Sequence, residues 1–414
     1  MQDNMENLAG QIRERVIRSL DFSRDISDRE MYELIDRAVF GELRGRVVPL
    51  EEKKSLRLRV FHSIRKLDVL QQLVDDPSIT EIMVNGTDNI FVEKDGVIRE
   101  LESRFESKEK LEDIVQQIVS SCNRVVNEAS PIVDARLENG SRVNIVLNPV
   151  ALNGPVVTIR RFPDKPITID RLIELGSLSP YLKEYISVLI RAGYNVFISG
   201  GTGSGKTTLL NALSDFIPKD LRVITIEDSA ELQIRGVPNL VRMEARNANV
   251  EGCKPITIRD LIKSSLRMRP DWLIVGEVRA DEAVDMLQAM NTGHMAMSTG
   301  HSNSAEDMLS RIETMVLMGM EIPLPAVRGQ IASGIDIVIH LGRLRDKSRK
   351  VLEIAELEKE LDPLTGKIKV NTLFKFEEDA GCREKVTGSW RKYNELKATE
   401  KLVAAGLELP ALDS

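Results

Sequence analysis

The residues with the clearest chemical meaning lie at positions 200–208, where the sequence reads GGTGSGKTT. This stretch fits the spacing G-x-x-x-x-G-K-[ST], which is typical of a loop that binds polyphosphate. Glycines let the backbone curl so that successive N–H groups converge on a phosphate at a helix N-terminus. At this spacing Lys206 reaches the β- and γ-phosphates and the Thr207 hydroxyl ligates Mg²⁺. The predicted binding residues are Gly200, Gly201, Thr202, Gly203, Ser204, Gly205, Lys206, Thr207 and Thr208.

Carboxylates follow two apolar segments downstream of this loop. One segment ends in Glu227 and Asp228, and the other ends in Glu277. Ligands bind at the carboxyl ends of strands in parallel α/β sheets, so these side chains are expected to face the phosphates; Asp228 could instead cap the following turn. Gly276 stands where many proteins with this loop carry the metal-binding aspartate. Glu277 would therefore hold the Mg²⁺ shell, polarise the attacking water, or share these duties with Glu227.

Two of the four histidines in the chain, His294 and His301, lie seven residues apart in a short segment rich in glycine and serine. A metal site is one interpretation, but no cysteine or histidine partner set accompanies them. The better interpretation is a segment whose imidazoles and hydroxyls hydrogen-bond the γ-phosphate or its water. Both histidines are therefore candidate site residues.

The elements around these residues predict an α/β nucleotide domain. An apolar strand at residues 196–198 leads into the loop, and a helix containing Leu209, Leu210 and Leu213 leads out of it. Strand, loop and helix in this order are the context that the motif requires.

A smaller α+β domain is predicted upstream, over residues 76–162. Strand patterns flank a long amphipathic helix that keeps one apolar face over residues 111–126. The late strands carry four arginines, Arg136, Arg142, Arg160 and Arg161. Each is either a surface residue or a cation that reaches a nucleotide bound to the next domain, since guanidinium suits phosphate better than any other side chain.

Length and composition favour two or three domains. A chain of 414 residues that is 42% hydrophobic and 29% charged can bury a large core, as an ordinary soluble protein does. Residues 1–13 show no secretion leader, and no apolar run approaches the roughly 18 residues of a membrane span, so a cytosolic location is expected. The three cysteines are far apart, which predicts reduced thiols. A net charge of -7, with only residues 343–350 locally basic, does not favour direct nucleic-acid binding.

Five segments are expected along the chain. They are a helical N-terminal extension (1–75), the α+β domain (76–162), a linker (163–176), the nucleotide domain (177–355) and a C-terminal appendage (356–414). The extension contains a capping-box pair, Ser27 and Glu30, ahead of apolar residues at helical spacing.

The order of the motifs resembles the type II/type IV secretion ATPase superfamily. Residues 200–207 match its Walker A motif, 226–232 its Asp box, 266–279 its Walker B motif and 290–304 its His box. Within the superfamily the chain is most similar to the CpaF-type ATPases of tight-adherence (Tad) pilus assembly, through residues 309–318, 328–333 and 404–410. The segment STGHS around His301 departs from the residues that are more common in that family.

The resemblance implies a RecA-like P-loop ATPase domain that follows a smaller α+β, PAS-like N-terminal domain, with ATP and Mg²⁺ as ligands. It also implies a homohexameric cytoplasmic motor on the cytoplasmic face of the inner membrane. The motor would dock on inner-membrane platform proteins, drive pilin extraction and have no direct contact with nucleic acid.

The resemblance further implies roles for individual residues. Arg142, Arg160 and Arg161 look like the N-terminal-domain arginines that reach the phosphates, and Arg279 fits the pattern after the Walker B motif. By the same likeness Glu227 orients the attacking water and Glu277 holds Mg²⁺.

Other functions are compatible with parts of the sequence. The traffic ATPase of a conjugation-like type IV secretion system is a close alternative, whereas the lack of a four-cysteine zinc module argues against the type II secretion branch. A RecA-like nucleic-acid translocase would share the core fold, but the acidic balance and the lack of interleaved basic and aromatic residues weigh against it. A scaffold that binds ATP without hydrolysing it would keep its function after the substitution Glu277→Gln. A motor with the same substitution would stall with ATP bound.

Overall fold

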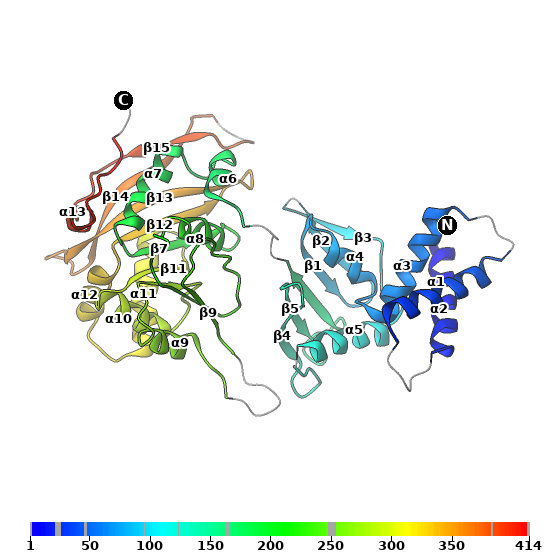
Figure 1. Ribbon diagram of the computed structural model, residues 1–414. Helices are drawn as coiled ribbons and strands as arrows, with labels where there is room; N and C mark the ends of the chain where they lie inside the picture. The colour runs from blue at the N-terminus through cyan, green and yellow to red at the C-terminus, as the bar shows by residue number, and fades with distance from the viewer. Residues whose placement is uncertain are drawn as a thin grey trace. The chain divides into compact units, whose positions relative to one another are not determined.

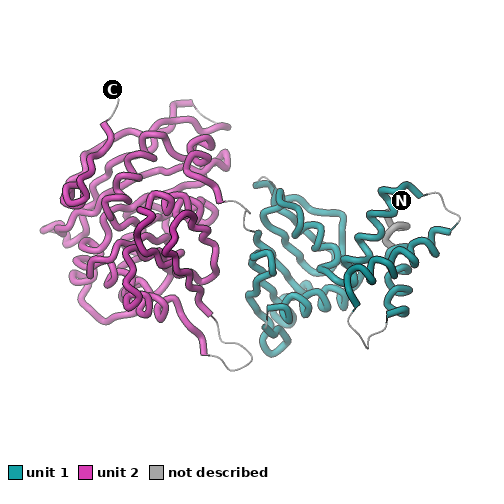
Figure 2. Tube along the Cα trace, viewed as in Figure 1, with its two compact units in different colours: residues 1–164, 249–251 teal, residues 165–248, 252–414 magenta. Residues whose placement is uncertain are grey.

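A computed structural model describes residues 2–20, 26–44, 48–94, 96–122, 124–161, 166–246, 254–381 and 384–411. The described residues divide into two compact units, the first ending at residue 161 and the second beginning at residue 166 (Figure 2). Among the residues described, no helix is long and apolar enough to cross a membrane. Cys122 is a free thiol, while Cys253 and Cys382 lie outside the described residues.

The first unit begins with a bundle of three helices, α1 (Gln2–Arg18), α2 (Asp28–Glu42) and α3 (Leu50–Arg65). Their apolar faces meet in a separate core that includes Ile12, Ile35 and Val60. The predicted capping box is confirmed, because the Ser27 and Glu30 side chains each accept a hydrogen bond from the other residue's backbone N–H.

A six-stranded antiparallel sheet forms the rest of the first unit, in the order β3-β2-β1-β6-β5-β4. Its strands are β1 (Ile79–Asn85), β2 (Asn89–Lys94), β3 (Val97–Leu101), β4 (Ile132–Arg136), β5 (Arg142–Val146) and β6 (Val156–Arg160). Helices α4 (Val69–Asp75) and α5 (Lys108–Ser121) share a core with one set of strand side chains. Helix α4 falls inside the predicted extension but packs Leu70 and Val74 into the core of the sheet. The helix predicted over 111–126 ends at Ser121.

The second unit contains a nine-stranded mixed sheet in the order β15-β14-β13-β12-β7-β11-β10-β8-β9 (Figure 1). The strands are β7 (Val196–Gly200), β8 (Val223–Glu227), β9 (Leu240–Glu244), β10 (Trp272–Val275), β11 (Met295–His301), β12 (Ile337–Arg343), β13 (Arg349–Leu361), β14 (Ile368–Glu378) and β15 (Gly388–Lys392). From β9 to β12 the strands are parallel, and from β12 to β15 they are antiparallel. The expected α/β domain is therefore confirmed.

Helices cover both faces of this sheet. They are α6 (Ile169–Glu174), α7 (Pro180–Arg191), α8 (Lys206–Ser214), α9 (Ile258–Ser265), α10 (Glu282–Asn291), α11 (Ala305–Gly319), α12 (Leu324–Gly334) and α13 (Glu400–Ala405). One core joins α6, α7, α8 and α13 to strand residues such as Val196 and Ile198, and the other joins α9 to α12 to residues such as Phe197. Successive side chains of a strand point to opposite faces, so a continuous apolar run such as β7 serves both cores.

The predicted linker and C-terminal appendage are tied into the second unit. Residues 163–165 of the linker lie outside the described residues, and the remainder contains α6. The boundary predicted between residues 355 and 356 falls inside β13, and the strands after it extend the same sheet. The chain after residue 393 then crosses back to the sheet, where Glu356 accepts hydrogen bonds from the backbone N–H groups of Lys397 (2.9 Å) and Ala398 (2.7 Å).

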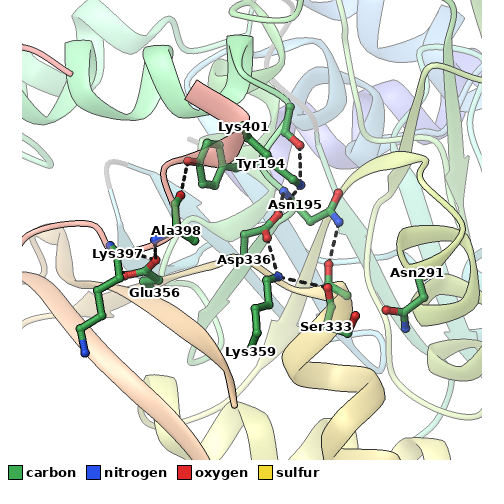
Figure 3. A network of polar contacts seen from close by, with 12 residues as sticks. Tyr194, Asn195, Asn291, Ser333, Asp336, Glu356, Lys359, Lys397, Ala398 and Lys401 are labelled. Atoms are coloured by element: carbon green, nitrogen blue, oxygen red, sulfur yellow. Dashed lines mark hydrogen bonds and ion pairs between the residues drawn. The ribbon is translucent and has the colours of Figure 1, made fainter. Parts of the chain in front are cut away.

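A buried carboxylate, Asp336, holds this C-terminal segment against the amino ends of the strands (Figure 3). Its oxygens accept from the Lys359 ammonium at 2.8 Å, the Lys401 ammonium at 2.6 Å and the Asn195 backbone N–H at 2.8 Å. The Asn195 side chain in turn donates to the Gly334 carbonyl at 2.6 Å and accepts from the Ala296 N–H at 2.9 Å. Because Asn195, Ala296 and Asp336 stand at the starts of β7, β11 and β12, the network fixes these strands relative to one another.

We predict that Asp336→Ala destabilises the second unit by about 2 kcal/mol, because it leaves the buried Asn195 N–H without its acceptor and removes the carboxylate partner of two ammonium groups, which keep backbone carbonyl acceptors. The expected loss of stability is modest because the Lys359 and Lys401 side chains are 46% and 39% exposed, so water can solvate their ammonium groups. Urea unfolding followed by tryptophan fluorescence measures it, since both tryptophans, Trp272 and Trp390, lie in this unit.

Lys397→Ala is the matched control, because its ion pair with Glu358 lies at the surface and should contribute under about 0.5 kcal/mol. Equal unfolding midpoints for the two variants would show that the Asp336 network does not stabilise the unit.

Candidate functional site

The phosphate-binding loop joins β7 to α8, as the sequence predicts. Strand β7 has parallel neighbours on both sides, β11 and β12, so side chains at the carboxyl ends of all three strands can approach the loop. Gly203 and Gly205 have φ angles of 70° and 93°, a left-handed conformation that glycine adopts without strain. Gly205 directly precedes α8, so the unsatisfied N–H groups of the first helical turn complete an anion site.

Lys206 is folded onto the loop itself. Its side chain is buried, and its ammonium donates to the carbonyls of Gly200 and Gly201, each at 3.1 Å. The same nitrogen lies 3.2 Å from Nδ1 of His301, which ends β11. The predicted lysine and the second predicted histidine therefore share one site.

Glu277 and Arg279, which follow β10, lie next to His301. Nε2 of His301 lies 3.0 Å from Oε1 of Glu277, although the contact is poorly aligned for a hydrogen bond. The Arg279 guanidinium donates to Oε2 of Glu277 at 2.7 Å and lies 3.9 Å from Asp228. The structure thus brings Lys206, His301, Glu277 and Arg279 together at the carboxyl ends of β7, β11 and β10.

The protonation of His301 follows from its neighbours. Burial lowers the pKa of His301, and the charge of Lys206 lowers it further. The charge of Glu277 raises this pKa but does not outweigh the two lowering effects. The ring is therefore neutral at pH 7. An ammonium can only donate, so Nδ1 accepts from Lys206 and the ring proton lies on Nε2, facing Glu277.

Glu227 is the last residue of β8 and is more deeply buried than Glu277. It is 3% exposed, and its Oε2 accepts hydrogen bonds from the backbone N–H groups of Glu231 (2.7 Å) and Leu232 (2.8 Å). Glu227 rather than Asp228 therefore caps the following turn. A Cβ on Gly276 would lie 3.2 Å from Cγ of Glu227. The glycine that replaces the usual aspartate thus leaves room for the Glu227 side chain.

The two glutamates have opposite pKa shifts. Burial raises the pKa of Glu227 to about 7, against the lowering effect of the Leu232 and Glu231 N–H groups. Burial would also raise the pKa of Glu277, but the hydrogen bond and charge of Arg279, with the charge of Lys206, hold it below its ordinary value. At neutral pH Glu277 is ionised and Glu227 is near its titration midpoint.

His294 does not join the site. It precedes β11, whereas His301 ends it, and seven residues of strand span roughly 23 Å. Its Nδ1 lies 3.3 Å from both the Thr292 hydroxyl and the Ala289 carbonyl, near the Asp336 network. The structure therefore brings only one of the two predicted histidines to the phosphate loop.

The predicted arginines upstream all belong to the first unit. Arg136, Arg142 and Arg160 lie directly opposite one another across β4, β5 and β6, on the face that α4 and α5 leave uncovered. Arg161 follows β6, and its guanidinium donates to the backbone carbonyls of Asp76 and, at 3.5 Å, Ile79. Arg161 therefore ties the end of β6 to the segment that leads from α4 into β1.

A second histidine near the loop was not predicted from the sequence. His340 on β12 is buried, and its Nδ1 lies 2.9 Å from the hydroxyl of Ser199, the residue before Gly200. Burial lowers the pKa of His340, so this ring is also neutral. A single histidine inside an otherwise apolar strand was the signal in the sequence.

Comparison with known proteins identifies the family. The family described as Type II/IV secretion system protein matches residues 64–401. The chain belongs to this family.

Relatives within the type II/IV secretion family include the conjugal transfer protein TrbB of Rhizobium radiobacter, which is 31% identical over 306 residues, covering 71% of this chain and 90% of TrbB. The type IV secretion system protein VirB11 of Brucella suis is 30% identical over 303 residues, covering 66% of this chain and 84% of VirB11. The X-ray structure of the Yersinia pseudotuberculosis ATPase DotB shares the fold, with a TM-score of 0.52 and 18% identity over 71% of this chain and 79% of DotB. The fold expected from the resemblance is confirmed, whereas the Tad subtype stays a prediction.

We predict that Glu227 makes the stability of the second unit depend on pH. Its folded-state pKa of about 7 exceeds its ordinary value of 4.5, so its contribution is fully present below pH 4.5 and is lost as the pH rises through about 7. Between pH 5 and 8.5 the wild type should lose about 2.5 kcal/mol more stability than Glu227→Gln, which cannot ionise. Urea midpoints from tryptophan fluorescence at each pH measure the difference; parallel profiles for the two proteins would refute the raised pKa.

Proposed function

We propose that this protein is an ATP-hydrolysing motor of the Tad type, which powers pilus assembly as a homohexamer. The observation that carries the proposal is the convergence of Lys206, His301, Glu277 and Arg279 on the phosphate-binding loop. Three of these side chains offer donors to a phosphate and the fourth is an ionised carboxylate, which together suit the transfer of a γ-phosphoryl group to water.

The residues present fit a nucleotide with Mg²⁺. Thr207, in the first turn of α8, and the ionised Glu277 would hold the ion, which needs only one or two protein oxygens beside phosphates and waters. When bound, Mg²⁺ neutralises the charge that develops on the phosphate oxygens. Lys206 would leave its present carbonyl acceptors for the β- and γ-phosphates, while neutral His301 would donate from Nε2.

The pKa values support a division of labour between the glutamates. Two carboxyl groups whose environments push their pKa values apart commonly take different roles in one reaction. Glu277, held ionised, would serve the metal shell, and Glu227, with a pKa of about 7, would accept the proton of the attacking water.

Arginines from the α+β domain complete the proposed site, in their own subunit or a neighbour's. Arg142 and Arg160 are better candidates for reaching the phosphates than Arg161, whose guanidinium already holds backbone carbonyls. Loss of the γ-phosphate would then release these arginines, and a clamp that opens on hydrolysis is how the motor would convert chemistry into movement.

The proposed setting is the cytoplasmic face of the inner membrane, where the hexamer would act on Tad-type platform proteins and through them on pilins. The resemblance of residues 309–318, 328–333 and 404–410 to CpaF-type ATPases supports this assignment. A second candidate function is the traffic ATPase of a conjugation-like type IV secretion system. The names of TrbB and VirB11 support this candidate about as well as the Tad assignment.

We predict that phosphate release from Mg²⁺·ATP, per mole of protein, rises with protein concentration as a six-subunit species forms, because the proposed motor works as a ring. Enzyme-coupled phosphate release and light scattering, recorded on the same samples, test this. Lys206→Ala should lose turnover at least about a hundredfold while its mass distribution without nucleotide stays that of the wild type.

A hexamer that binds ATP without hydrolysing it would contradict the motor and favour a nucleotide-binding scaffold. The Lys206→Ala allele in the source organism separates the two secretion candidates. Loss of surface pili supports the Tad assignment, whereas intact pili with loss of conjugal transfer would overturn it.

A further inference from the structure

The basic hairpin at residues 343–350 has no role in the site described so far. Strands β12 and β13 pair so that Arg343 stands directly opposite Arg349. Asp346 fixes the turn between them by accepting hydrogen bonds from the Ser348 N–H at 3.0 Å and the Val386 N–H at 2.9 Å. The two arginines are therefore held at the base of a well-ordered turn.

Both arginines lie against the phosphate-binding loop. Nε of Arg349 donates to the Gly203 carbonyl at 2.8 Å, and its Cδ lies 3.4 Å from where a Cβ on Gly205 would be. Nη1 of Arg343 lies 3.7 Å from the corresponding position on Gly203. The sheet explains the approach, because β12 runs parallel to β7 and pairs Leu341 with Gly200, the first loop residue.

Within the part of the chain that the structure describes, no acidic side chain pairs with Arg343 or Arg349. Arg345 on the same turn, in contrast, pairs with Glu378 at 2.7 Å. Like charges directly opposite each other on neighbouring strands destabilise the pairing. An anion bound beside both guanidinium groups would remove this repulsion, and guanidinium is well matched to phosphate.

The order of the strands indicates which phosphates are in reach. His301 ends β11 and Glu277 follows β10, on one side of β7, whereas Arg343 ends β12 and Arg349 begins β13, on the other side. If the reacting γ-phosphate lies beside His301 and Glu277, the arginine side of the loop faces the part of the nucleotide that is not transferred.

We propose that Arg343 contacts the diphosphate portion of a nucleotide bound in its own subunit. Arg349 is a positioning residue that holds the Gly203 carbonyl and thereby directs the neighbouring N–H groups of the loop toward the phosphates. The inference rests on the nucleotide site of the proposed function. It assigns nucleotide affinity, rather than the rate of hydrolysis, to residues outside the phosphate-binding motif.

Calorimetric titration of the full-length protein with Mg²⁺·ADP and with Mg²⁺·ATP tests the assignment. Arg343→Gln and Arg349→Gln should each raise Kd about tenfold, and equally for both nucleotides, because the contact does not involve the γ-phosphate. KM should rise with them while kcat changes less than about twofold. Arg349→Lys keeps the charge but loses the Nε donor, so it should recover only part of the affinity.

Arg345→Gln is the matched control, since it removes a cation from the same turn whose ion pair is with Glu378, and its Kd should stay within twofold of the wild type. Thermal unfolding by tryptophan fluorescence shows whether each variant is folded. If folded Arg343→Gln and Arg349→Gln bind ADP as tightly as the wild type does, or if kcat falls while Kd stays at the wild-type value, the inference is wrong. If the wild type itself binds neither nucleotide, the proposed function fails instead.

Discussion

The buried ammonium of Lys206 is the constraint around which the site is organised. A cation taken out of water must be hydrogen-bonded or paired, and here two carbonyls of its own loop and a neutral histidine satisfy it. Its charge in turn lowers the pKa of His301 and helps to keep Glu277 ionised. Phosphate oxygens are better acceptors for an ammonium than these carbonyls. A bound nucleotide can therefore replace the carbonyls as the acceptor of Lys206 without leaving a buried charge unpaired.

The sheet positions Lys206 and its partners because contacts hold both ends of β7. At the amino end, Asn195 and Asp336 tie the starts of β7, β11 and β12 to one another and to the C-terminal segment. At the carboxyl end, the same three strands lead into the phosphate loop, His301 and Arg343, and β13 adds Arg349 opposite Arg343. A shift of register at one end would therefore displace cationic groups at the other. The C-terminal strands and helix, far from the loop in sequence, thus help to position it.

The sequence predicted what depends on local pattern: the loop, the strands that end in Glu227 and Glu277, and the α/β order of the elements. It could not show which residues meet across the sheet. His294 and His301 looked like one polar segment because Ser298 and Thr299 lie between them. In the structure their hydroxyls donate to the Val275 and Gly276 carbonyls, which makes the segment a buried strand and separates the two rings. Contacts such as Asp336 with Lys401 or Arg349 with Gly203 join residues too distant in sequence for any periodicity to reveal.

The central claim is that Glu277 belongs to a hydrolytic site rather than to a passive binding site. Single-turnover hydrolysis of Mg²⁺·ATP by Glu277→Gln and by the wild type, with ATP affinity measured on the same samples, tests it most directly. The account predicts that the variant binds ATP within a few-fold of the wild type but releases phosphate at least about a hundredfold more slowly, because its amide lacks the negative charge of the ionised carboxylate. Hydrolysis at the wild-type rate by a folded Glu277→Gln protein would contradict the account.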